Sequence, residues 1–327
     1  MKTMTSRFIT IVIAIAFADL SGAQVSIAQS YPTRPIRLIL PVSAGAGMDA
    51  IARTVGVRVT QNIGQSIVVD ARGGGGGTIA AELVAASAPD GYTIIMMSAT
   101  AVVRQLLYPG SYDILRDFSP ISQMTAQPYL LVTHPSIPVK SLQDLVAYAK
   151  ANPGKLNYAS SGQGSIIHLA TELLRFQTGM PAMVHVPYKG MGSAIPDVVS
   201  GYTRISLSSI VTTQPLVRSG RLRGIAVTSA ERAKSSPEIP TIAESGVKGY
   251  AVVNWYGVLA PAKTPRVIVD RLYKEIAKVL NDPEVEKRIA AEGAEAIDRT
   301  PKEFASHIKG EIEKWSKVIK EAGIKGD

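Results

Sequence analysis

Three loops of small and hydroxyl-bearing residues carry most of the chemistry that the sequence can support. They are residues 43–47, the five consecutive glycines at 73–77, and residues 160–165. Each loop leads into a segment with the apolar spacing of a helix, so free backbone N–H groups and the positive end of a helix dipole meet there. We therefore expect an anion-binding site made of backbone amides and hydroxyls.

A dinucleotide site is the main alternative for the first loop. Gly45-Ala-Gly47-Met-Asp-Ala50 fits the G-x-G-x-x-A fingerprint, and Asp70 follows about 20 residues later, where a ribose-binding carboxylate would stand. Residues 41–44, however, separate the preceding apolar run from the glycines, whereas the dinucleotide turn begins at its first glycine. The glycines at 73–77 are not a phosphate loop, since no Gly-Lys-Ser/Thr follows them.

A secreted hydrolase is the second alternative. Ser161, His168 and Asp197 supply the residue types of a nucleophile, a base and an orienting acid, but the Gly-x-Ser-x-Gly elbow is absent from the sequence. The sequence also lacks His-Glu-x-x-His and a paired carboxylate cluster. We expect no metal, no cofactor and no catalysis.

Composition limits the function classes further. The 327 residues include no cysteine, which excludes disulfides and thiolate sites. The net charge is +9, but the basic residues are dispersed and aromatics make up only 6%, so a nucleic-acid interface is not expected. Lys2 and Arg7, an apolar run at 8–17 and Ser26-Ile-Ala28 have the pattern of a signal peptide at 1–28, with Ser21-Gly-Ala23 as a rival cleavage site. A periplasmic protein is expected.

Periodicity predicts an α/β fold. Apolar strands at 36–40, 65–70 and 92–97 alternate with helices beginning at 49 and 79, as in a parallel sheet covered by helices. Further segments are expected as strands at 120–133, 156–160, 185–188, 205–207 and 222–228, and as helices at 141–151, 166–177, 194–199, 265–280, 284–292 and 301–322. We expect domain 1 to comprise residues 29–131 and 226–327, and domain 2 residues 132–225.

Short motifs along nearly the whole mature chain resemble one family. They are Tyr31-Pro-Thr-Arg-Pro-Ile36, Asp49-x-x-Ala-Arg53, Ala88-Pro-Asp-Gly-Tyr-Thr93, Asn157-Tyr-Ala-Ser-Ser-Gly-Gln-Gly-Ser165 with His168-Leu169, Val186-Pro-Tyr-Lys-Gly190, Ala226-Val-Thr-Ser229, Pro237-Glu-Ile-Pro-Thr241, and Trp255-Tyr-Gly257 with Ala260-Pro261. In order and spacing the chain resembles the periplasmic solute-binding proteins of tripartite tricarboxylate transporters, the Bug or TctC-like receptors. The resemblance implies a two-domain periplasmic binding protein of type II (Venus flytrap) with a cleft between the domains.

The same resemblance implies a receptor that binds a small organic carboxylate and delivers it to membrane permease subunits; we expect a monomer. The expected ligand-binding residues are Ser43, Ala44, Gly45, Ala46, Gly47, Asp49, Gly75, Gly76, Gly77, Thr78, Ser98, Thr100, Ser160, Ser161, Gly164, Ser165, His168 and Asp197. The chain departs from the family where Pro41-Val42 replaces a proline-phenylalanine pair and where Ala71-Arg precedes the glycines in place of Asn-x-Pro. Arg204 stands where an aspartate is common. The identity of the carboxylate stays open.

Overall fold

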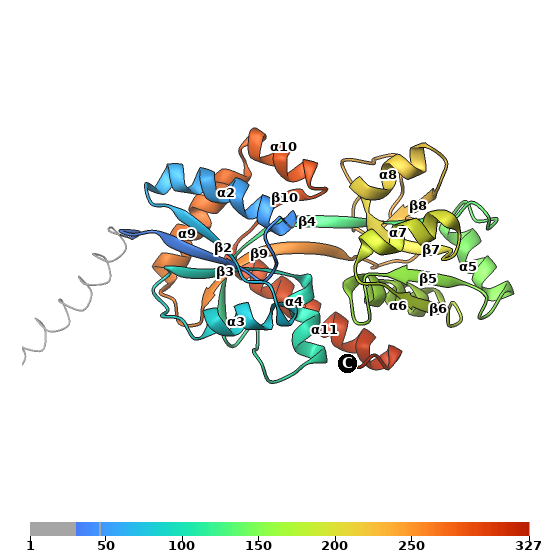
Figure 1. Ribbon diagram of the computed structural model, residues 1–327, viewed down its shortest axis with the longest axis horizontal. Coiled ribbons are helices and arrows are strands. Elements are labelled where there is room, and N and C mark those ends of the chain that lie inside the picture. The colour runs from blue at the N-terminus through green and yellow to red at the C-terminus, as the bar shows by residue number, and fades with distance from the viewer. Residues whose placement is uncertain (1–30, 46, 327) are drawn as a thin grey trace, which may run out of the picture.

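The chain forms two lobes joined by two long strands (Figure 1). The structure, a computed structural model, describes residues 31–45 and 47–326, so the expected signal peptide and Ala46 lie outside the described residues. The strands follow the order β2-β1-β3-β9-β4-β7-β5-β6, with β10 and β8 also paired to β4. The expected α/β class is confirmed.

The first lobe is built around the three parallel strands that the sequence predicts. These are β1 (Ile36–Leu40), β2 (Ile67–Ala71) and β3 (Thr93–Ser98), with β1 in the middle. The antiparallel strands β9 (Val253–Pro261), β4 (Phe118–Thr133) and β10 (Glu295–Arg299) extend this sheet. The helical elements are α2 (Gly47–Ile63), η1 (Gly75–Gly77), α3 (Thr78–Ala85), α4 (Ala99–Leu107), α9 (Arg266–Leu280), α10 (Pro283–Ala291) and α11 (Pro301–Ala322).

The second lobe has a smaller sheet. Its strands are β5 (Asn157–Ser160), β6 (Val184–Pro187), β7 (Ile205–Ser209) and β8 (Arg223–Val227). Its helices are α5 (Leu142–Ala151), α6 (Ile166–Thr178), α7 (Met191–Ser200) and α8 (Ile210–Arg218). Ser141 caps α5 as its residue type predicts, because its hydroxyl accepts the Asp144 N–H at 3.1 Å.

Strand β4 changes partners along its length and so belongs to both lobes. Its residues up to Pro128 pair with β9, whereas those from Tyr129 onward pair with β7 and β8. Because β8 pairs with residues 130–133 of β4, the chain returns to the first sheet only at β9. The domain limits at 131 and 226 stay a prediction. In the structure β4 changes partners between Pro128 and Tyr129, and the chain rejoins the first sheet at Val253, where β9 begins.

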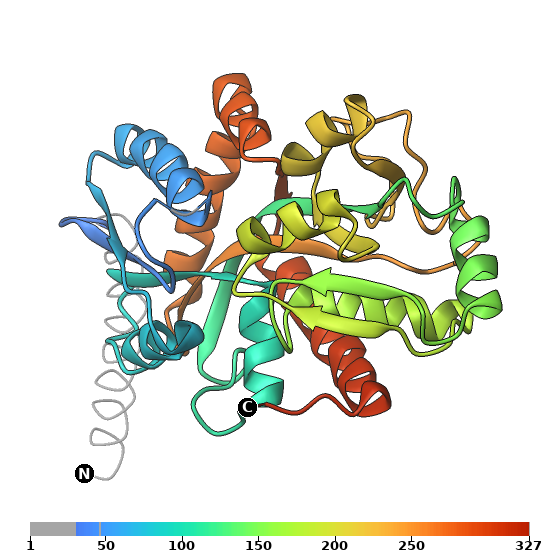
Figure 2. The same cartoon turned by 45° about the vertical axis from the view of Figure 1, so that its right-hand side comes forward.

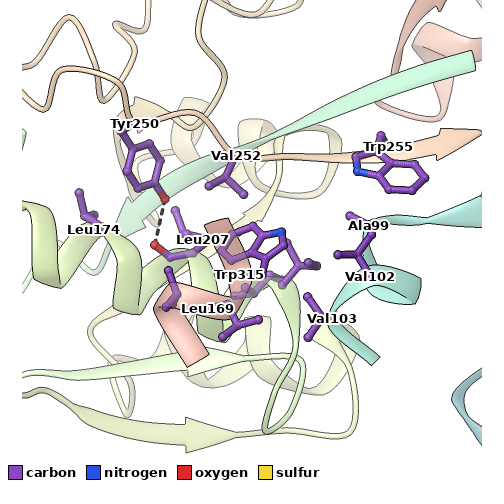
Figure 3. Packing of buried hydrophobic residues seen from close by; sticks show 14 of the residues in the cluster. Ala99, Val102, Val103, Leu169, Leu174, Leu207, Tyr250, Val252, Trp255 and Trp315 are labelled. Atoms are coloured by element: carbon purple, nitrogen blue, oxygen red, sulfur yellow. Dashed lines mark hydrogen bonds between the residues drawn. The ribbon is translucent and has the colours of Figure 1, made fainter. Parts of the chain in front are cut away.

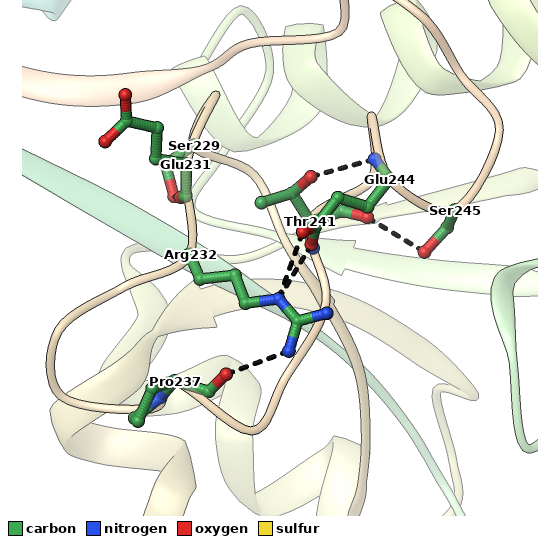
Figure 4. Close-up of polar contacts among 7 residues, drawn as sticks. All are labelled: Ser229, Glu231, Arg232, Pro237, Thr241, Glu244 and Ser245. Atoms are coloured by element: carbon green, nitrogen blue, oxygen red, sulfur yellow. Dashed lines mark hydrogen bonds and ion pairs between the residues drawn. The ribbon is translucent and has the colours of Figure 1, made fainter.

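The segment between β8 and β9 is held by one arginine (Figure 4). The Nε of Arg232 donates to both carboxylate oxygens of Glu244, at 2.9 and 3.1 Å, and its Nη1 donates to the Pro237 carbonyl at 3.0 Å. Glu244 in turn accepts the Thr241 N–H at 2.8 Å. These bonds give the segment a fixed shape without regular secondary structure.

A single apolar core connects the lobes. Helix α11 contacts α4 of the first lobe and α6 of the second (Figure 2). Trp315 of α11 is 0% exposed and lies among side chains of both helices, including Val102, Val103 and Leu169 (Figure 3). Phe304 and Ile308 of this helix are buried too, and Ile312 and Ile319 pack at the edge of the core.

Truncating Trp315 should therefore be among the most damaging single changes. We expect Trp315→Ala to lower the free energy of unfolding by about 3–5 kcal/mol, because it leaves a cavity where the two lobes meet. Urea denaturation measures the change. Lys317→Ala on the exposed side of the same helix is the control and should shift stability by less than about 0.5 kcal/mol. Equal effects of the two substitutions would contradict the bridging role of Trp315.

Candidate functional site

A cavity of about 350 Å³ lies between the two lobes, and we call it the cleft cavity. The first lobe contributes Val42, Met48, Ser98, Thr100, Asn254 and Tyr256, the second lobe contributes Ser161, Ser165, Ile166 and Ile167, and Tyr129 lies on the crossing strand β4. Its volume is in the range of small-molecule sites. Both lobes must be in place for this cavity to exist.

Three helices begin at the cleft cavity. Met48 is the second residue of α2, Ser98 is the N-cap of α4, and Ser165 is the N-cap of α6. Unpaired N–H groups and the positive ends of the helix dipoles gather at such termini. The hydroxyl of Ser98 makes no capping hydrogen bond, so it is free to contact a ligand. The cavity is suited to an anion for this reason.

A second cavity of about 260 Å³, the side cavity, extends into the first lobe. It shares Val42, Ser98 and Thr100 with the cleft cavity. The rest of its lining is mainly apolar apart from the glycine amides: Pro41, Gly76, Gly77, Ala81, Ile95, Met97, Ala101 and Tyr112. Together the two cavities offer a polar entrance and a largely apolar recess.

The glycine run 73–77 is shaped by an arginine that sequence reasoning missed. Gly76 has φ 63°, and a Cβ built there would lie 2.5 Å from Nη1 of Arg104. Arg104 also donates from Nε to the Thr78 hydroxyl at 3.1 Å. The guanidinium thus occupies the space that a side chain at position 76 would need, and it brings a positive charge to the start of α3.

Asp49 holds the first loop. Its Oδ2 accepts the Gly45 N–H at 3.0 Å, and its Oδ1 lies 2.9 Å from Nε of Arg53. The Gly45 hydrogen bond and the Arg53 bond lower the pKa of the Asp49 carboxyl. Asp49 is buried and already paired, so the contacts of its carboxylate are with the protein.

The alternative chemistries are not assembled. Asp197, the candidate orienting acid, accepts the Tyr188 hydroxyl at 2.7 Å, and the Nδ1 of His168, the candidate base, accepts the Gly164 N–H at 3.1 Å, so these atoms are engaged with other partners than each other. Asp70, the ribose-binding candidate, is paired with Arg37 and Arg72. Hydrogen bonds from these guanidiniums, that of Arg72 being the largest contribution, lower the pKa of Asp70.

The structure brings six of the predicted residues to the two cavities. Gly76, Gly77, Ser98, Thr100, Ser161 and Ser165 line a cavity. The remaining described candidates lie outside both linings: Ser43, Ala44, Gly45, Gly47, Asp49, Gly75, Thr78, Ser160, Gly164, His168 and Asp197. Arg204 is likewise outside them and donates from Nε to the Gly201 carbonyl at 3.1 Å. The ligand contacts themselves stay a prediction.

Residues from the crossing strands were missed as site residues. Tyr129 on β4, and Asn254 and Tyr256 on β9, form a wall of the cleft cavity. Asn254 is fixed there because its Nδ2 donates to Gln127 Oε1 at 2.8 Å, across 127 positions of sequence. The Trp255-Tyr-Gly257 motif was a signal for this wall, although it did not reveal which side chain faces the cleft.

A larger cavity of about 660 Å³ lies on another part of the surface, between β10, α11 and the segment after β8. Its charged side chains are largely paired within the protein, as Arg232 is with Glu244 and Lys314 is with Glu311. Within residues 31–45 and 47–326, no helix begins among the residues that line this cavity, so the cleft is the better candidate for an anion site.

Comparison with known proteins decides the family. The model of the tripartite tricarboxylate transporter family receptor matches residues 51–324. The chain belongs to this receptor family. It is 36% identical over 325 residues to protein BugT of Bordetella pertussis, covering 98% of this chain and 99% of BugT. The receptor is thus a Bug or TctC-like solute receptor, as its motifs predict.

Solved structures agree with this assignment. The structure of R. palustris Rpa4515 with adipate is 36% identical, with a TM-score of 0.75, and the match covers 91% of this receptor and 100% of that chain. MatC from Rhodopseudomonas palustris with bound malate is 30% identical, with a TM-score of 0.71, covering 88% and 100%. The expected two-domain periplasmic binding protein fold is confirmed. Across residues 31–45 and 47–326 of the receptor, no helix has the length and hydrophobicity needed to span a membrane.

The packing of Arg104 on the glycine run can be tested with a matched pair of glycines. Gly64 has a φ of 71° like Gly76, but a Cβ at position 64 would meet nothing within 4 Å. Gly64→Ala should therefore destabilise by about 1 kcal/mol from backbone strain alone. We expect Gly76→Ala to destabilise by at least about 1 kcal/mol more, measured by chemical denaturation. Equal losses of stability in the two variants would show that the Arg104 side chain can move away from position 76 without a cost in free energy.

Proposed function

We propose that this receptor binds a small organic carboxylate in the cleft between its lobes, without chemical conversion, and presents it to permease subunits from the periplasm. The observation that carries the proposal is the character of the lining. The residues described around the two cavities include no charged side chain, while three helices begin at the cleft cavity and α3 begins beside the side cavity. Amides, hydroxyls and helix dipoles recognise an anion in this arrangement.

The arrangement favours a ligand with an anionic group toward each lobe. The start of α6 and Ser161 face the cleft cavity from the second lobe, while Ser98, Thr100 and the start of α2 face it from the first. The apolar recess of the side cavity accommodates an aliphatic or aromatic body. Adipate and malate in the related structures are dicarboxylates, which supports this class. The signal-peptide pattern at 1–28 supports a periplasmic location.

A thermal-shift and calorimetric screen tests the proposal. The panel contains mono- and dicarboxylates of increasing length together with their neutral amides as matched controls. A carboxylate present at 100 times its Kd should add about 2.7 kcal/mol of stability, and its amide should add far less. Turnover of a ligand, or tight binding of NAD with none of any acid, would overturn the receptor proposal.

The uncharged groups of the cleft should contribute more to ligand affinity than Arg72, the basic residue that borders the glycine run. We expect Ser161→Ala to weaken binding of the best ligand about tenfold, or ~1.4 kcal/mol, because a bond to a charged acceptor is lost. Arg72→Ala should weaken binding less than about threefold and only at low salt, since Arg72 is half exposed and paired with Asp70 at 2.9 Å. Calorimetry at two ionic strengths measures both. Loss of binding in Arg72→Ala at every salt concentration would instead indicate a guanidinium clamp.

A further inference from the structure

Three aromatic rings are stacked behind the cleft loop of the second lobe. His185 of β6 stacks on Tyr158 of β5, with 4.9 Å between centroids and 17° between planes. His168 of α6 stacks on His185 at 3.9 Å and 19°. Neither histidine lines the cavities, and His168 is only 5% exposed. The two histidines need a role other than direct contact with the ligand.

Ser160 at the start of the loop fixes the tautomer of His185. The Ser160 hydroxyl oxygen is 3.0 Å from the Gly162 carbonyl, 3.1 Å from the Gly162 N–H and 2.6 Å from Nε2 of His185. A hydroxyl has one proton to donate and two lone pairs. All three contacts are satisfied together only when Ser160 donates to Gly162 and accepts from Nε2–H of His185.

His168 holds the other end of the loop as a hydrogen-bond acceptor, whereas His185 acts as a donor to Ser160. Its Nδ1 accepts the Gly164 N–H at 3.1 Å, and its own backbone N–H donates to the Ser165 hydroxyl at 3.2 Å. Nδ1 must therefore carry no proton. A second proton on His168 would face the Gly164 N–H and break this contact, whereas a second proton on His185 would go to Nδ1 and leave the bond to Ser160 intact.

The one charged group that favours a protonated His185 is Glu172, and its effect is smaller than those of burial and of the neighbouring His168. Glu172 of α6 accepts the Tyr158 hydroxyl at 2.9 Å, and it is already paired with Arg175 at 2.8 Å. Burial lowers the pKa of His168 to about 4. Burial, and then the neighbouring His168, lower that of His185 to about 4 as well. Both rings are neutral at pH 7.

We propose that His168 is a positioning residue: its neutral Nδ1 fixes the Gly164 amide, and with His185 it holds residues 160–165 in the shape that presents Ser161 and Ser165 to the ligand. This role rests on the proposed function, because it concerns how the loop presents hydroxyls to a ligand bound in the cleft. The contact itself exists without ligand, so it can be tested separately.

The direction of the pH effect follows from the neutral ring. Above about pH 6.5 His168 is unprotonated in both the folded and the unfolded chain. As the pH falls from 6.5 toward 4, the unfolded chain takes up the proton first, so stability declines in that window. As it falls through about 4, the folded ring is protonated too and Gly164 loses its acceptor.

Amide exchange in the ligand-free protein tests the contact. His168→Phe keeps an aromatic ring at this position but removes the nitrogen acceptor. The protection of the Gly164 amide against hydrogen exchange at pH 7 should then fall at least tenfold. His168→Asn places an oxygen near the position of Nδ1 and should retain protection within threefold. The wild type should lose this protection near pH 4, whereas His168→Asn should not. His307→Phe is the matched control, because His307 is a partly buried histidine whose pKa burial also lowers to about 4, on α11 away from the loop.

Two results would overturn the proposal. One is equal Gly164 protection in the wild type and His168→Phe. The other, which needs no variant, is a ¹⁵N spectrum of the imidazoles that places a proton on Nδ1 of His168 at pH 7. Adipate binding by calorimetry is the functional readout, and His168→Phe should weaken it at least tenfold while His168→Asn stays within threefold. If adipate fails to bind the wild type, the ligand choice fails, and the amide protection still decides the role of His168.

Discussion

The packing of α4 and α6 against one shared side chain is the constraint on which the site depends. These helices come from different lobes, and both point their N-termini at the cleft cavity. Trp315 lies between them in an apolar core that continues through both lobes. On this side the lobes cannot separate without exposing that core, and the two crossing strands β4 and β9 join them as well.

Recognition of an anion without charged side chains requires that the amides be rigid before the ligand arrives. Asp49 holds the first loop through Gly45, and His168 holds residues 160–165 through Gly164. The carboxylates of Asp49 and Asp70, on the first lobe, are paired with arginines. This pairing offsets the negative charge of these two side chains beside the first-lobe loops.

Most of the regular structure and all three loops could be predicted from sequence, because apolar periodicity and turn residues are local signals. Strands β1 to β3 and helices α5, α6, α9 and α11 lie close to their predicted positions. Helix α4 was missed because Ser98-Ala-Thr100 has the composition of a loop, and only packing of Val102 and Val103 makes the segment a helix. Helix α8 and strand β10 were missed as well. The cleft wall of Tyr129, Asn254 and Tyr256 was not predictable, since it forms where strands distant in sequence pair.

Arg104 changes the electrostatics that the sequence suggested for the glycine run. No base stands within residues 73–77, yet the fold places the Arg104 guanidinium directly against Gly76. It lies outside both cavity linings and is held by Thr78 and by the ring of Tyr108, 4.4 Å from its Cζ. Its charge therefore adds to the positive end of the dipole at the start of α3, beside the side cavity. Five glycines can approach an anion closely, but on their own they would be too mobile to select one. The arginine that fills the space beside them supplies both the shape and part of the positive potential.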